Sequence, residues 1–86
     1  MNYILAVFKS RSATLNFANA LRSNGIPAAV INTPNQITRA CGISVKFFAE
    51  YFEKAREIAS RMQIFAYFDG FYAYGNSYGR QILTKL

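Results

Sequence analysis

The sequence predicts an α+β fold of the ferredoxin-like type, in which two helices cover one face of a four-stranded antiparallel sheet. Short apolar runs alternate with two longer amphipathic segments in the order β-α-β-β-α-β. A hydrophobic fraction of 52% with 16% charged residues is typical of a chain that builds a packed core. Because 86 residues are too few for two domains, we expect one domain over residues 1–75, then a tail or short edge strand over residues 76–86.

The first half of the chain predicts a strand, a helix and a second strand. Residues 3–8 are an apolar run rich in strand formers, and the polar residues 9–12 suit the start of a helix because serine caps unpaired N–H groups. The spacing of the next residues predicts a helix, and four of them would lie on one of its faces: Thr14, Phe17, Ala18 and Leu21. Asn24-Gly25 then ends the helix. Residues 27–32 predict the second strand, and residues 33–42 predict a polar connection.

The second half predicts a strand, a helix and an aromatic strand. Residues 43–47 alternate between apolar and polar, which is typical of a half-buried strand. The spacing predicts an amphipathic helix over residues 52–62, through Phe52, Ala55, Ile58, Ala59 and Met62. Residues 64–74 predict an aromatic strand, in which Asp69-Gly70 is either a hairpin turn or a bulge. The bulge is favoured because both arms of such a hairpin would be short, and residues 75–79 then break the pattern.

The composition excludes several kinds of chemistry. The chain has no histidine, and its one cysteine can form neither an intrachain disulfide nor a cysteine-rich zinc site. We therefore expect no metal and no cofactor. We also expect no independent enzyme, because Asp69 and the glutamates of residues 50–61 form no converging acid–base pair.

The net charge of +6 predicts anionic partners, either nucleic acid, an acidic protein or an oxyanion, although it can also serve solubility alone. Acidic and basic residues balance over residues 50–61, so the excess lies elsewhere. No apolar run is long enough to cross a bilayer, and the N-terminus lacks the basic start of a signal peptide. Together with a free thiol, these features predict a cytoplasmic protein without membrane contact.

Cys41 is the side chain with the strongest nucleophilic potential. A thiol reacts as the thiolate, which nearby positive charge and open N–H groups favour. Arg39 lies two residues before Cys41, and Gly42 leaves one side of the sulfur open. The polar residues before the cysteine predict a loop or the entrance to a strand. The alternative is a buried, inert thiol, since free cysteines are among the most buried residues.

At this point the chain resembles a family of short bacterial selenium/sulfur carrier-like proteins. The resemblance covers roughly residues 2–74. It is carried by Asn24-Gly25-Ile26-Pro27, by the proline-led loop of residues 34–42 that ends in Cys-Gly, by the alternating residues 43–47, and by Phe68-Asp69-Gly70-Phe71-Tyr72.

The resemblance implies that Cys41 accepts sulfur or selenium from a donor protein and passes it to an acidic acceptor protein. It also implies that Thr38, Arg39, Gly42 and Lys46 belong to the binding site, with the cations favouring the thiolate. Three residues depart from the family pattern: Asn35 and Lys46 stand where arginine is common, and Thr38 stands where serine is favoured. Asn35 in particular weakens any expectation of bidentate anion binding.

Two other functions remain open. One is a basic nucleic-acid-binding module, in which sheet aromatics stack on bases, with Tyr67, Tyr72, Tyr74 and Lys46 as candidates. Against it, the chain has no Lys/Arg-Gly-Phe/Tyr stretch of the kind that RNA-recognition sheets carry. The other is a non-catalytic interaction or adaptor protein, for which a homodimer formed through an aromatic strand edge or the tail is one form.

Overall fold

The computed structural model describes residues 3–37, 41–62, 67–77 and 80–86. Its elements follow the chain in this order: β1 (Tyr3–Phe8), α1 (Arg11–Ser23), β2 (Ala28–Asn32), β3 (Ile43–Phe48), the 3-10 helix η1 (Ala49–Tyr51), α2 (Phe52–Arg61), β4 (Phe68–Ser77) and β5 (Arg80–Lys85).

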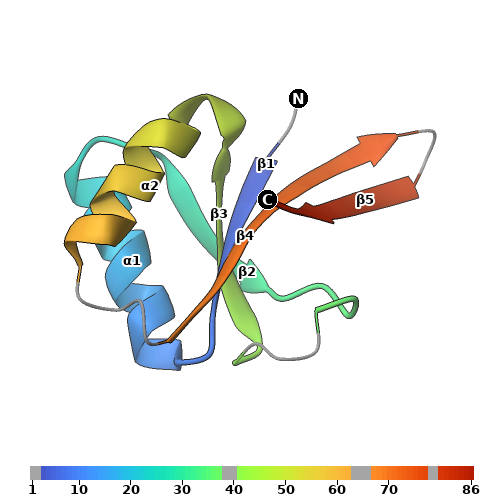
Figure 1. Cartoon of the computed structure of the whole chain (residues 1–86), viewed down its shortest axis with the longest axis horizontal. Helices are drawn as coiled ribbons and strands as arrows, with labels where there is room; N and C mark the ends of the chain where they lie inside the picture. Colours follow the sequence, from blue (N-terminus) through green and yellow to red (C-terminus); the bar gives the residue numbers. More distant parts are fainter. Residues whose placement is uncertain (1–2, 38–40, 63–66, 78–79) are drawn as a thin grey trace.

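The strands form one antiparallel sheet in the order β2-β3-β1-β4-β5. Both helices lie on the same side of it, and the β4–β5 hairpin extends away from them (Figure 1). The predicted α+β class, with two helices and an antiparallel sheet, is therefore confirmed. The predicted number of strands is wrong, because β5 adds a fifth strand beside β4. The finer assignment to the ferredoxin-like type stays a prediction.

Helix α1 begins at a capped N-terminus. The side chain of Ser10 accepts a hydrogen bond from the backbone N–H of Ala13 at 3.3 Å, and the Thr14 hydroxyl donates to the Ser10 carbonyl at 2.9 Å. Serine at this position satisfies an N–H group that has no partner within the helix. At the other end, Gly25 has a φ of 77°, and Ile26 donates to the Leu21 carbonyl, which closes the helix as predicted.

The core lies between the sheet and the helices. Alternate residues of the strands meet the apolar faces of α1 and α2 in a cluster rich in phenylalanine, which includes Phe8, Phe17, Phe47 and Phe71. Phe71 contacts the rings of four other phenylalanines, Phe17, Phe47, Phe52 and Phe68. Helix α2 packs its predicted buried face inward and carries exposed ion pairs of Glu53 with Arg56 and of Glu57 with Arg61 on its other side.

The central strand β1 is buried on both faces. Ile4, Ala6 and Phe8 belong to the helix-side core, whereas Leu5 and Val7, which alternate with them, are also 0% exposed. The opposite face of β1 is therefore covered as well. In Figure 1 the described residues that follow β2, 33–37, run away from the helices.

Strand β4 contains the predicted bulge. Val7 pairs with Gly70 and Phe8 pairs with Phe68, so Asp69 is an extra residue on β4. Asp69-Gly70 is thus a bulge and not a hairpin turn. The predicted start of this strand, residues 64–66, lies outside the described residues. The strand continues through Gly75 to Ser77, so the predicted break at residue 75 is wrong.

The C-terminal residues pair with β4 along most of its length. The register runs from Ser77 opposite Arg80 to Tyr72 opposite Lys85, and Leu86 then donates to the Phe71 carbonyl at 2.9 Å. Strand β5 therefore becomes one edge of the sheet, and β2 is the other.

Candidate functional site

Cys41 lies directly before β3, where β1 ends and α1 begins. Its backbone N–H donates to the Phe8 carbonyl at 3.2 Å, which ties it to the last residue of β1. The residue is half-buried, and its thiol is free. This placement agrees with the predicted entrance to a strand and differs from that of an inert core cysteine, which is fully enclosed.

The sulfur has two polar neighbours. Sγ of Cys41 lies 3.5 Å from Oγ1 of Thr14 and donates weakly to the Ile43 carbonyl at 3.6 Å. The Thr14 hydroxyl donates to the Ser10 carbonyl, so the one S–H hydrogen of Cys41 can point either to the Ile43 carbonyl or to Oγ1 of Thr14. A hydroxyl can rotate, and beside a thiolate the same group can turn and donate its hydrogen to sulfur.

The contact between Cys41 and Thr14 lies at the first turn of α1. Thr14 is 0% exposed and stands one turn into the helix, so Cys41 lies beside the positive end of the helix dipole. The sequence pattern assigned Thr14 to the buried face of the helix and gave it no role at the site. The signal that could have found it is a hydroxyl among apolar neighbours, because a buried hydroxyl needs a partner.

The loop before Cys41 is closed at its base by Thr33. Its backbone N–H donates to the Gly42 carbonyl at 3.0 Å, and its hydroxyl lies 2.7 Å from that of Ser44, which is 0% exposed. Gly42 has a φ of 101°, a conformation that L side chains rarely adopt, yet no atom of the described residues lies within 4 Å of where its Cβ would be. Glycine is thus favoured at this position by the backbone conformation and not by a lack of space among the described residues.

The structure brings together only part of the predicted site. Cys41 and Gly42 are adjacent, whereas Thr38 and Arg39 lie outside the described residues. Lys46 pairs with Leu5 of β1, and Leu5 is about 10 Å along the strand from Phe8, whose carbonyl binds Cys41. The Lys46 ammonium points to the ring of Tyr3, at 4.2 Å from its centroid. No described contact joins Lys46 to the sulfur.

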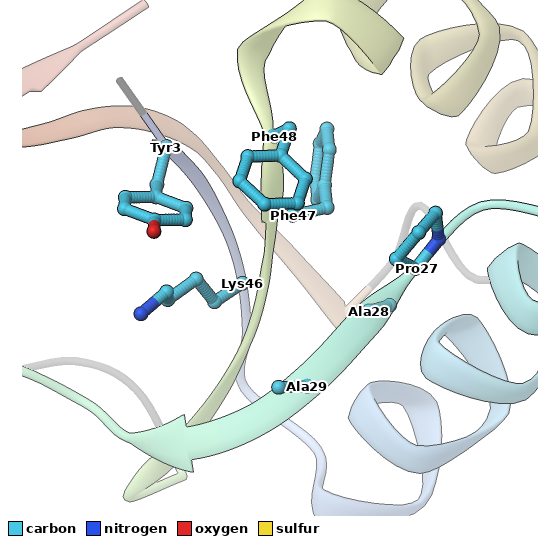
Figure 2. A pocket seen from close by; sticks show the side chains of 7 residues that line it. All are labelled: Tyr3, Pro27, Ala28, Ala29, Lys46, Phe47 and Phe48. Atoms are coloured by element: carbon cyan, nitrogen blue, oxygen red, sulfur yellow. The ribbon is translucent and has the colours of Figure 1, made fainter. Parts of the chain in front are cut away.

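Lys46 instead lines a separate pocket at the other end of β3, with a volume of about 310 Å³. Figure 2 shows its lining residues, Tyr3, Pro27, Ala28, Ala29, Lys46, Phe47 and Phe48. Of the aromatics considered for nucleic-acid binding, Tyr74 packs edge-on against Tyr3. The hydroxyl of Tyr72 donates to Asp69 at 2.8 Å, and Tyr67 is exposed before β4. Tyr72 and Tyr74 lie on the same face of the sheet as Lys46, because all three are cross-strand neighbours of Tyr3 or Leu5, whereas no described contact joins Tyr67 to them.

The described part of the chain contains neither a cluster of metal ligands nor a membrane-spanning helix. Within residues 3–37, 41–62, 67–77 and 80–86, no group of three or more histidine, cysteine, aspartate or glutamate residues could hold a metal ion. In the same residues, no helix is long and apolar enough to cross a membrane.

The fold and the site define a small α+β protein with a single, half-buried cysteine beside the first turn of a helix. The family model described as "Putative Se/S carrier protein-like" matches residues 3–68, and the chain belongs to this family. The match ends where β4 starts, so most of β4 and all of β5 lie outside it. No curated protein matches the chain, and no solved structure does.

Proposed function

We propose that this protein is a sulfur or selenium carrier in which Cys41 holds the transferred atom as a persulfide or its selenium counterpart. The observation that supports the proposal is the family membership together with the half-buried free thiol of Cys41, two residues before β3.

Sulfur loading is a thiol exchange. The Cys41 thiolate attacks the outer sulfur of a persulfide on the donor protein, a new S–S bond forms on Cys41, and the donor leaves as its thiolate. No net oxidation occurs, since the outer sulfur arrives already in the sulfane state. An acceptor nucleophile then takes that outer sulfur, and Cys41 returns to the thiolate.

The neighbours of Cys41 suit this exchange. The Thr14 hydroxyl, 3.5 Å from Sγ, can donate to the thiolate before attack and after release of the sulfur. Beside Gly42, none of the described residues comes within 4 Å of where a Cβ would stand, which supports access to this side of the neighbouring cysteine. In this proposal Cys41 is a carrier residue, and the donor supplies the activation, so the protein needs no acid–base machinery of its own.

The partners and the location follow from charge and chemistry. A net charge of +6 favours an acidic acceptor protein, because opposite charges speed encounter. A free thiol that is loaded and unloaded in cycles suits a reducing compartment, so we place the protein in the cytoplasm. The adaptor and nucleic-acid functions gain no support from the family assignment and are not proposed.

Intact-mass analysis tests the proposal. The protein is incubated with a persulfide-loaded sulfurtransferase, and the expected product is the protein with the mass of one added sulfur atom, which a reducing agent removes. Cys41→Ser is the matched control and should remain unmodified. A native wild-type protein that gains no sulfur, or whose thiol resists alkylation until it is unfolded, would contradict the proposal.

A further inference from the structure

A second site is indicated by the pocket around Lys46, which the proposed carrier function does not use. It lies where β2 begins and β3 ends, at the opposite end of the sheet from Cys41. At about 310 Å³ it is within the range of pockets that hold small molecules. On β2, Ala29 is the cross-strand partner of Lys46 and adds only a methyl group to the lining (Figure 2).

One wall of the pocket is a set of aromatic rings that are already packed together. Tyr3 stacks on Phe48 with ring centroids 5.2 Å apart and an angle of 29° between the planes. Tyr74 supports Tyr3 from the side, with centroids 6.5 Å apart. A flat ligand can stack on such a wall with little loss of side-chain freedom, because the protein rings are held in place before it binds.

The pocket contains one charged group and no acid to neutralise it. Lys46 is half-buried, and its ammonium lies over the Tyr3 ring. None of the lining residues is acidic, and both ion pairs found among the described residues lie on α2. A ring face satisfies an ammonium only in part, so an anion that enters the pocket gains a charged partner.

We propose that this pocket binds a small molecule made of a flat aromatic ring and one anionic group, either carboxylate or phosphate. The ring lies against the wall of Tyr3 and Phe48, and the anion contacts the ammonium of Lys46. The site is independent of Cys41, because Lys46 pairs with Leu5 while Cys41 is bonded to Phe8.

Titration of the full-length protein with 2-naphthoate tests the assignment, with binding followed by calorimetry and by the amide signals of β2 and β3. Two further probes separate the contributions: 2-naphthamide has the same ring without the charge, and inorganic phosphate has the charge without a ring. We expect 2-naphthoate to bind about tenfold more tightly than the amide, the effect of one charge-assisted hydrogen bond. Phosphate alone should leave the amide signals of both strands unchanged.

The variants separate this pocket from the general basic surface. Lys46→Met keeps the aliphatic stem and should weaken naphthoate binding about tenfold without changing amide binding, whereas Lys46→Arg should preserve it. Tyr3→Leu should weaken both ring probes. Lys85→Met is the matched control, because Lys85 also places its ammonium over a tyrosine, Tyr72, but outside the pocket.

Three results would overturn the assignment. Equal affinity for 2-naphthoate and 2-naphthamide would show that Lys46 does not contact the anionic group. An equal loss in Lys85→Met and Lys46→Met would show general attraction to a basic surface. Naphthoate-induced changes confined to the residues beside Cys41 would place the ligand at the thiol. Thermal unfolding of every variant confirms that each protein titrated is folded.

Discussion

The hydroxyl of Thr14 lies 3.5 Å from the sulfur of Cys41, although 26 residues separate them in the chain. This contact joins the first turn of α1 to the residue that precedes β3. It also gives the sulfur a hydrogen-bonding neighbour that depends on correct folding of the helix. The reactivity of Cys41 and the integrity of the α1 N-terminus are therefore linked.

Replacement of Thr14 by valine should slow alkylation and sulfur loading of Cys41. Valine keeps the shape of threonine but removes the hydroxyl that can donate to the thiolate, so the anion loses a charge-assisted hydrogen bond. We expect a decrease of roughly tenfold in the rate of iodoacetamide modification at neutral pH. Thr14→Ser keeps the hydroxyl and should react at nearly the wild-type rate. An unchanged rate in Thr14→Val would show that the contact has no effect on reactivity.

Replacement of Ser10 by alanine should lower the free energy of unfolding. The Ser10 side chain caps the N–H group of Ala13, and loss of an N-cap typically costs about 1 kcal/mol. Urea denaturation followed by circular dichroism measures the change. Ser12→Ala, on the exposed side of the same turn, is the control and should remain within about 0.5 kcal/mol of wild type. If the two variants are equally stable, the cap contributes nothing.

Replacement of Gly42 by alanine should destabilise the fold through the backbone alone. At a φ of 101° an L residue is strained, at a cost of about 1–3 kcal/mol, while the space around the new Cβ is empty. We therefore expect a lower urea midpoint and an altered rate of Cys41 alkylation, because the strain relaxes beside the thiol. Gly25→Asn is the comparison, since asparagine tolerates the φ of 77° found at the end of α1. If Gly42→Ala is as stable as the wild-type protein, an alanine at this position is not strained.

Removal of residues 80–86 should leave a folded but less stable protein that self-associates. Strand β5 covers the edge of β4, and an uncovered edge presents unpaired backbone groups that pair with another chain. Sedimentation should show dimers or larger species for the truncated protein only. The measurement also tests the homodimer expected from the sequence. A stable, monomeric truncated protein would show that β5 does not protect the edge.

Much of the architecture could be predicted because its signals are local. The apolar run of β1, the capped start and glycine end of α1, and the spacing of α2 each lie within a short stretch of chain. Strand β5 was predicted only as one of two alternatives, a tail or a short edge strand, because the glycines at positions 75 and 79 interrupt the pattern that marks a strand. Gly75 nevertheless lies within β4, in a pair with Ile82.

The candidate site could be predicted only in part for the same reason. Cys41 and Gly42 are adjacent in the sequence, and the polar residues before them predicted the entrance to a strand, which agrees with the position of Cys41 in the structure. Thr14 reaches the sulfur only through folding. Lys46 was expected near Cys41, but the side chain of a strand residue reaches what lies across the sheet, here the ring of Tyr3.

The two bonds of Thr33 have a consequence for how cargo would travel. They join Thr33, which precedes the cysteine, to Gly42 and Ser44, which follow it, and the backbone of Cys41 is bonded to the end of β1. These bonds hold the cysteine backbone to the sheet, unlike the long flexible arm that carries a tethered prosthetic group between several sites. In the proposed carrier, each transfer would therefore require the whole molecule to diffuse and dock, and its rate would depend on encounter between proteins.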